Sequence, residues 1–297
     1  MSAYLNTVET SYIDKAAIAI ATDVSRDEVT MTNLPWSFRI SDIAHSFGFD
    51  ELKVLNDFAA LAIAIPSIKN NQFTQVNDFQ EQTHKKPKSA AIAIIGAGTG
   101  LGMSGLLEHQ GVWMPLEGEG GHISLSAVSD FEHKIIQNLR KKFEHVSAET
   151  VLSGKGIQNL YSAISNIHNV TAKDLQPSEI VRLGIHQQDK TCELTLNTFC
   201  SFLGGTAGNL ALTIGSHGGV YIGGGIVNHL GEYFIKNKTF MQRFQEKGAK
   251  KNLLKNIPIH VITDTRIGIQ GAFESMKPQY QNIGVSCFNQ NLVLQSQ

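Results

Sequence analysis

The sequence predicts an α/β protein with two lobes. Short apolar runs bounded by glycine or polar residues alternate with helical patterns along the chain. Each run is apolar on both faces, as expected for a strand in a sheet that helices cover. The expected strands are Ala16–Val24, Leu52–Leu55, Ala90–Ile95, Gly219–Ile222 and Ile257–Ile262.

Length and one polar segment predict the division into lobes. A chain of 297 residues is long enough for two lobes with a sizeable core. The segment Asn70–Lys88 is polar and has no helical or strand periodicity, so it is the best candidate for a linker. It would separate an N-terminal lobe from a larger one.

Two short helices have recognisable start signals. Ser41 is expected to cap a helix that runs to Phe47. Ser129 followed by Glu132 has the spacing of a capping box, in which each residue bonds a main-chain N–H near the other. A second helix is therefore expected after Ser129.

The longest expected helix is Asp189–Ile214, whose apolar residues recur at a spacing of three or four. Gly204 and Gly205 lie in its middle. Glycine weakens a helix by about 1 kcal/mol at each such position. Either close packing against another backbone or a break in the helix must therefore account for the pair.

Composition excludes several classes of function. Apolar residues make up 42% of the chain and charged residues 17%, and the net charge of -1 is spread along it. We therefore expect no nucleic-acid partner and no membrane partner. Cys192, Cys200 and Cys287 form no CxxC pair, which indicates a reducing compartment, and no signal segment is visible, so a cytoplasmic location is expected.

A glycine-rich segment follows the third expected strand, in the run "AIAIIGAGTGLGMSGLL". Glycines let a backbone approach a phosphate closely and offer it several N–H donors. Gly100, Gly102 and Gly105 match the dinucleotide-binding pattern G-x-G-x-x-G, but that site needs a helix to begin there. The following residues instead favour a second strand with a turn at "EHQG". The alternatives are a phosphate-holding hairpin of another kind and a hairpin that binds nothing.

Gly223, Gly224 and Gly225 form a second cluster at the end of a later expected strand. Three consecutive glycines leave a flat, open surface that suits a planar ring. A tight strand-to-helix turn that binds nothing is the alternative.

Asn56 and Asp57 end the second expected strand, where side chains of open α/β sheets meet ligands. Asp57 could equally cap the apolar helix that follows it, and the two roles can coexist.

Polar residues among glycines suggest a site for sugar hydroxyls. Glu119 and His122 lie in the loop "LEGEGGH", and Glu149 follows in "HVSAET". A carboxylate accepts hydrogen bonds and a histidine donates or accepts them, so both suit vicinal hydroxyls. The histidine spacing does not fit a metal site. Glu149 could alternatively be a charged residue in a first helical turn.

Six segments together resemble the bacterial glucokinase family of actin-like, hexokinase-type sugar kinases. In chain order they are "MTNLPWSF", "LNDFAALAIAIP", "GAGTGLG", "LEGEGGH", "HVSAETVLSGKGI" and "GGVYIGGGIV". The likeness runs from about Ala16 to about Ala272. It implies a two-lobed actin-like (ribonuclease H-like) fold, with residues 1–70 and 262–297 in a small lobe and residues 71–261 in a large lobe.

The resemblance also implies an activity: transfer of phosphate from ATP, with Mg²⁺, to the 6-hydroxyl of glucose, by a cytoplasmic homodimer. Asp57 matches the family's catalytic base. The other matches are Asn33, Asn56, Glu119, His122 and Glu149 for the sugar, Gly98, Thr99 and Gly100 for the phosphates, and Gly223, Gly224 and Gly225 for adenosine. The zinc-binding cysteine cluster of the related ROK sugar kinases is absent, so no structural zinc is expected.

One family motif has no counterpart in this sequence. The family opens with D-x-G-G-T-N, whose aspartate helps to place Mg²⁺ and whose backbone holds the ATP phosphates, whereas Met1–Asp14 resembles a helix that comes later. We therefore expect a small lobe that lacks its first strands and an impaired kinase. The alternative function is a remnant that binds sugar without transferring phosphate. A sugar-responsive repressor would need a helix-turn-helix, which is not visible.

Overall fold

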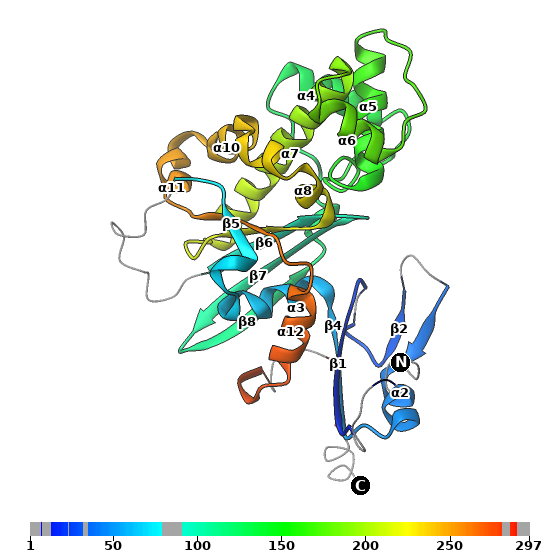
Figure 1. Cartoon of the computed structure of the whole chain (residues 1–297), viewed down its shortest axis with the longest axis vertical. Helices are drawn as coiled ribbons and strands as arrows, with labels where there is room; N and C mark the ends of the chain where they lie inside the picture. Colours follow the sequence, from blue (N-terminus) through cyan, green and yellow to red (C-terminus); the bar gives the residue numbers. More distant parts are fainter. Residues whose placement is uncertain are drawn as a thin grey trace. The chain divides into compact units, whose positions relative to one another are not determined.

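The computed structural model describes residue 7 and residues 13–22, 24–31, 35–78, 91–280 and 286–289. The chain divides into two compact units. Unit 1 comprises residues 1–67, 112–115 and 266–297, and unit 2 comprises residues 68–111 and 116–265 (Figure 1). Asn33 and nearly all of the expected N-terminal helix lie outside the described residues.

Unit 1 is built on a three-stranded sheet in the order β1-β4-β11. β1 runs parallel to β4, with Ile20 paired to Asn56, and β11 runs antiparallel to β4. β2 and β3 form a separate hairpin. The strands are β1 (Lys15–Ile20), β2 (Glu28–Thr30), β3 (Ser37–Arg39), β4 (Glu51–Asn56) and β11 (Ser286–Asn289).

Two helices of unit 1 pack at unusually close range. A Cβ at Gly271 of α12 would overlap the main-chain carbonyl of Ala60 in α3, so glycine is what permits this approach. Leu55, Ala60 and Ile63 are fully buried beside these helices. The helices of unit 1 are α2 (Ile40–Phe47), α3 (Asp57–Ala64) and α12 (Ile267–Ser275), with single 3₁₀ turns η1 (Ile65–Ser67) and η6 (Pro278–Tyr280).

The sheet of unit 2 is mixed and has the order β5-β10-β9-β6-β7-β8. β6, β9 and β10 are parallel, while β5 and β7 run antiparallel to their partners. Side chains of β6 are buried along its whole length, as expected for a strand covered on both faces. The strands are β5 (Phe73–Gln75), β6 (Ala91–Ala97), β7 (Leu101–His109), β8 (Val112–Gly118), β9 (Val220–Gly223) and β10 (Ile259–Ile262). Residues 112–115 of β8 are counted with unit 1, and the rest of the strand with unit 2.

The helices of unit 2 gather on one side of this sheet in Figure 1. Their shared core includes Phe199, Phe202 and Leu203 of α7, which are buried. The helices are α4 (Asp130–Leu139), α5 (Gly154–Ile167), α6 (Pro177–Ile185), α7 (Lys190–Ile214), α8 (Gly225–Leu230), α9 (Glu232–Lys236), α10 (Lys238–Gln245) and α11 (Lys251–Lys255). Single 3₁₀ turns are η2 (Asn70–Gln72), η4 (Gly120–His122) and η5 (Gly248–Lys250).

The glycine pair in α7 reflects close packing, because the helix continues unbroken through it. A Cβ at Gly204 would overlap the main-chain carbonyl of Phe240 in α10. A Cβ at Gly208 would lie 2.7 Å from the carbonyl oxygen of Phe244. The small residues therefore allow α10 to lie against α7, and the alternative of a helix break is wrong.

All five strands expected from apolar runs are confirmed, with ends that differ by a few residues. The Ser129 cap is also confirmed, since its hydroxyl accepts from the N–H of Glu132. The carboxylate of Glu132, however, accepts from the N–H of Val128 at 2.7 Å. The reciprocal half of the expected capping box is therefore made one residue earlier.

Two expectations are wrong. Ser41 does not cap α2: the helix begins at Ile40, and the Asp27 carboxylate accepts from both the N–H and the hydroxyl of Ser41 at 2.9 Å. A distant carboxylate thus replaces the local cap.

The expected linker Asn70–Lys88 is partly wrong as well. Its first residues form η2 and then β5, which pairs antiparallel with β10 at the edge of the large sheet. Phe73 anchors this short strand, because its ring lies edge-on to His260 with 4.8 Å between centroids. Residues 79–88 lie outside the described part of the chain.

Within the described residues, no helix has the length and apolar character that crossing a lipid bilayer requires.

Candidate active site

The joint between β4 and α3 carries Asn56 and Asp57 in unit 1. Asn56 is the N-cap, and its Oδ1 accepts from the main-chain N–H of Phe58 at 2.9 Å and of Ala59 at 3.3 Å. Its Nδ2 donates to the carbonyl of Thr22 at 3.3 Å. Asp57 is the first residue of the helix, and its Oδ1 accepts from Phe58 at 2.9 Å. The cap proposed for Asp57 therefore belongs to Asn56, because the helix starts one residue earlier than that alternative assumed.

In unit 2, Gly98, Thr99 and Gly100 form the turn between β6 and β7. The N–H of Gly98 donates to the carbonyl of Gly100 at 2.8 Å. β7 pairs antiparallel with β6 immediately after the turn. Because a strand follows these glycines, the dinucleotide-binding alternative is wrong. Thr99 is exposed at the tip of the turn.

Glu149 is tied to this hairpin. Its half-buried carboxylate accepts from the main-chain N–H of Leu101 through Oε2 at 2.7 Å. A Cβ at Gly100 would lie 2.5 Å from the same oxygen, so a side chain there would displace the carboxylate from this position. The N–H of Glu149 donates to the carbonyl of Gly121 at 2.9 Å. Glu149 therefore connects the hairpin with the loop that carries His122.

The loop of Glu119 and His122 is held differently. Its backbone forms η4, and the N–H of His122 donates to the carbonyl of Glu119 at 3.0 Å. The side chains are 75% and 62% exposed, and His122 Nε2 lies 4.0 Å from Glu119 Oε2. His145 donates through Nε2 to the carbonyl of His122 at 2.9 Å. The backbone of the loop is thus fixed while both side chains face solvent.

The second glycine cluster lies beside the hairpin, because Gly223 pairs with Gly96 where the parallel strands β9 and β6 end. Gly224 has φ +92°, and a Cβ there would overlap the main-chain carbonyl of Ala97. Gly225 begins α8 and faces open space. Gly224 is therefore required for the close approach of this turn to β6, whereas a side chain at position 225 would meet no neighbour within 4 Å.

One neighbour of the hairpin is not identified by sequence alone. α5 begins at Gly154, whose N–H donates to the carbonyl of Gly98 at 2.8 Å, and Ser153 caps the helix by accepting from Gly156. The serine and glycine spacing of "LSGKG" is typical of a helix start and could have indicated it.

Contacts within unit 2 thus bring together Glu119, His122, Glu149 and both glycine clusters. Asn56 and Asp57 belong to unit 1. Among the described residues, no group of three or more histidine, cysteine, aspartate or glutamate side chains could hold a metal ion.

A family model described as glucokinase matches residues 1–278. The chain belongs to the glucokinase family. The resemblance seen in the six sequence segments is confirmed. A glucokinase of Photorhabdus laumondii is 39% identical over 264 residues, which cover 89% of this chain and 80% of the relative. Glucokinases of Neisseria meningitidis are 40% identical over 281 residues, or 95% of this chain and 84% of theirs.

Solved structures of the glucokinase family share the fold. The crystal structure of glucokinase from an Antarctic psychrotroph has a TM-score of 0.77 and 37% identity, covering 87% of this chain and 78% of the other. A glucokinase from Balamuthia mandrillaris in complex with glucose has a TM-score of 0.75 at 18% identity, covering 88% and 78%. The second likeness concerns the fold alone. The actin-like α/β sugar kinase fold expected from the sequence is confirmed.

Proposed function

We propose that this chain catalyses the ATP-dependent phosphorylation of glucose at its 6-hydroxyl, giving glucose 6-phosphate and ADP. The observation that carries the proposal is the 39–40% identity to glucokinases over about nine-tenths of the chain. The strand-to-helix position of Asp57 and the hairpin at Gly98–Gly100 support it, since phosphoryl transfer depends mainly on positioning and charge stabilisation.

Asp57 is the proposed general base, which accepts the proton of the sugar 6-hydroxyl as that oxygen attacks the phosphoryl group. The first turn of α3 fixes the backbone of Asp57, and a carboxylate placed within hydrogen-bond reach of a hydroxyl can accept its proton. Asn56 places it: its two hydrogen bonds to the N–H groups of Phe58 and Ala59 set where α3 begins. Direct sugar binding by Asn56 stays a prediction.

Glu119, His122 and Glu149 are the proposed ligands of the sugar hydroxyls. Glu149 Oε2 accepts from Leu101 N–H, and a carboxylate has two oxygens with further lone pairs that can accept from a hydroxyl. A sugar analogue that lacks one of these hydroxyls would leave a polar group unpaired, which is how such a site discriminates.

Gly98, Thr99 and Gly100 are proposed to hold the ATP phosphates, and Gly223, Gly224 and Gly225 to border the adenosine. Two features support this: Thr99 is exposed at the tip of the turn, and no atom lies within 4 Å of the position that a Cβ at Gly225 would occupy.

Mg²⁺ is proposed as the metal that accompanies ATP. The candidate residues offer carboxylate oxygens, which suit this ion, and phosphate oxygens and water would supply most of its ligands. When bound, Mg²⁺ neutralises charge on the transferred phosphoryl group. A homodimer and a cytoplasmic location stay predictions.

The test compares Asp57→Ala with Asp42→Ala, an exposed aspartate in the first turn of α2 in the same unit. A coupled ADP assay should show turnover with glucose that falls by about a hundred-fold or more in Asp57→Ala. Calorimetry should show that the same variant still binds glucose, and Asp42→Ala should behave as the parent.

Two results would contradict this account. An unchanged kcat in Asp57→Ala would remove it from the base role. Glucose binding by the parent chain without any ADP release would instead support the alternative of a sugar-binding protein that does not transfer phosphate.

A further inference from the structure

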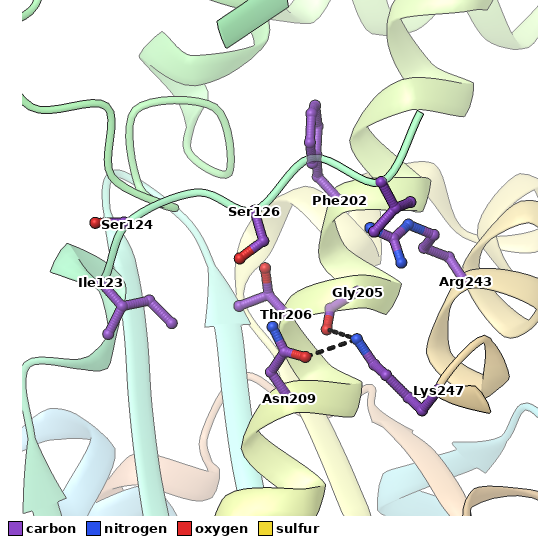
Figure 2. Close-up of a pocket in the computed structure, with 10 residues that line it drawn as sticks. Ile123, Ser124, Ser126, Phe202, Gly205, Thr206, Asn209, Arg243 and Lys247 are labelled. Atoms are coloured by element: carbon purple, nitrogen blue, oxygen red, sulfur yellow. Dashed lines mark hydrogen bonds between the residues drawn. The ribbon is translucent and has the colours of Figure 1, made fainter. Parts of the chain in front are cut away.

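Unit 2 contains a cavity outside the candidate active site, between the segment that follows His122 and the helices α7 and α10 (Figure 2). Its volume is about 130 Å³, well above the roughly 10–15 Å³ that one water requires. Its polar wall consists of Ser124, Ser126, Thr206, Asn209, Arg243 and Lys247. The cavity therefore has both the size and the lining for a polar guest larger than one water.

Arg243 is the strongest indication of a missing partner. It is only 6% exposed, yet neither its Nε nor its Nη1 has a hydrogen-bond partner within the described part of the chain. Its Nη2 lies 3.5 Å from Glu132 Oε2. A buried donor without an acceptor destabilises a protein by about 1–3 kcal/mol, and more when it is charged. An acceptor in the cavity would remove that cost.

Lys247 supplies a second cation on the same wall. Its Nζ donates to the carbonyl of Gly205 at 3.1 Å and to Asn209 Oδ1 at 2.6 Å, as Figure 2 shows. An ammonium group has three N–H donors, so one remains for a guest. Burial, with Arg243 as a further cause, lowers the pKa of Lys247, which indicates that its charge lacks full compensation.

The charges around the cavity leave an excess of positive charge. Arg243 and Lys247 contribute two positive charges, and Glu132 is the buried carboxylate beside them. Glu132 is already engaged, because it accepts from Val128 N–H at 2.7 Å and from the Ser201 hydroxyl at 3.1 Å. Glu246, the other carboxylate that acts on Lys247, is exposed to solvent. One negative charge in the cavity would complete the balance.

We propose that this cavity binds a small oxyanion of the phosphate class, through Arg243, Lys247 and the hydroxyl of Thr206. Guanidinium and ammonium groups form strong, charge-assisted hydrogen bonds with phosphate oxygens. Thr206 is 6% exposed and faces Ser126 in Figure 2. The phosphate group could be free or part of a phosphorylated metabolite, since the cavity chemistry is the same for both.

The site is placed to act on the sugar loop. Ile123 and Ser124 line the cavity and directly follow His122 in the chain. Glu132 joins Arg243 to the N–H of Val128, at the other end of the same segment. An anion on Arg243 would therefore stiffen residues 123–128.

The test is calorimetric titration of the whole chain with sodium phosphate, against sodium chloride at equal ionic strength. Titrations in saturating ADP separate the cavity from the proposed nucleotide site. Lys247→Met should weaken phosphate binding by at least about ten-fold, the loss expected for one charge-assisted hydrogen bond. Lys251→Met removes a nearby exposed lysine and should leave the affinity within about two-fold, as expected for a screened surface charge.

Arg243→Gln should abolish phosphate binding. If that variant does not fold, the Lys247→Met variant alone tests the proposal. Titration with glucose 6-phosphate, in saturating ADP and glucose so that the proposed active site is occupied, distinguishes the two sources. Binding tighter than that of inorganic phosphate, and weakened by Lys247→Met, indicates a phosphorylated metabolite, whereas equal or weaker binding indicates the free ion. The proposal is overturned if the parent binds no phosphate, if ADP displaces all of it, or if Lys247→Met binds as the parent does. Because no turnover is measured, these outcomes leave the proposed function untouched.

Discussion

Glu149 and the Glu119–His122 loop are proposed to bind the same sugar, yet unit 2 holds them in different ways. Glu149 is half-buried, and Leu101 N–H fixes one of its oxygens at 2.7 Å. Glu119 and His122 are 75% and 62% exposed, with 4.0 Å between their side chains. Glu149 is therefore part of the scaffold as well as the site, whereas the loop side chains are ordered at the cost of ligand binding energy.

The sharpest test of this difference is Glu149→Ala. We expect kcat/KM for glucose to fall by about a hundred-fold or more, because both a sugar ligand and the support of the hairpin are lost. The free energy of unfolding should also fall by about 1–3 kcal/mol, since Leu101 N–H loses its partner. Kinetics and urea unfolding measure the two effects. Glu144→Ala, an exposed change in the same segment, should alter neither.

Gly100→Ala tests the same contact from the other side. The added Cβ would lie 2.5 Å from Glu149 Oε2 and push the carboxylate away from Leu101. We expect a loss of about 1–3 kcal/mol in the free energy of unfolding, because the displaced carboxylate leaves the N–H of Leu101 without its acceptor. Gly98→Ala is the matched control, because nothing lies within 4 Å of its Cβ. Equal stability of the two variants would show that Glu149 is not held as described.

The buried strands around this site are predictable from sequence, but the hydrogen bonds between distant residues are not. β6 is buried throughout and β9 is buried except for the half-buried Tyr221, so their apolar runs identify them, and the glycines mark where they end. The bond from Leu101 to Glu149 joins residues far apart in the chain, and no local pattern encodes it. The same holds for Asp27, which bonds Ser41 in place of a local cap.

β5 shows the same limit for the fold. Its residues Phe73–Gln75 contain a single apolar side chain, and the segment therefore resembles a linker. Its hydrogen bonds come from β10, near the other end of unit 2 in sequence, and its ring contacts come from Tyr221 and His260. Tertiary packing thus overrides local composition here.

His122→Asn should affect glucose binding but not the stability of the fold. We expect the KM for glucose to rise by about ten-fold, the effect of one lost hydrogen bond to a ligand. The melting temperature should stay unchanged, because the hydrogen bonds of His122 within the loop use its main chain, and its side-chain approach to Glu119 is long and exposed. His133→Asn, at an exposed position on α4, serves as the control. A drop in melting temperature for His122→Asn would mean that this side chain also supports the fold.

A last test separates the site from the sheet that supports it. His260 of β10 is 9% exposed, and its ring contacts those of Phe73 and Tyr221, each 4.8 Å away between centroids. Burial lowers the pKa of His260 from 6.5 to about 4. The unfolded chain therefore binds this proton more readily than the folded chain, and the stabilisation that is complete above pH 6.5 is lost as the pH falls toward 4.

His260→Phe removes this proton uptake while keeping a ring in place. Between pH 6.5 and pH 4, urea unfolding of the parent should lose on the order of 2 kcal/mol more stability than that of the variant. Turnover at pH 7 should stay unchanged, because His260 lies on the edge side of the sheet, where β10 pairs with β5, away from the hairpin that β6 and β7 form. If the stability of parent and variant falls equally with pH, the acid sensitivity of unit 2 does not come from His260. A change in kcat would instead mean that β10, as well as Glu149, supports the geometry of the active site.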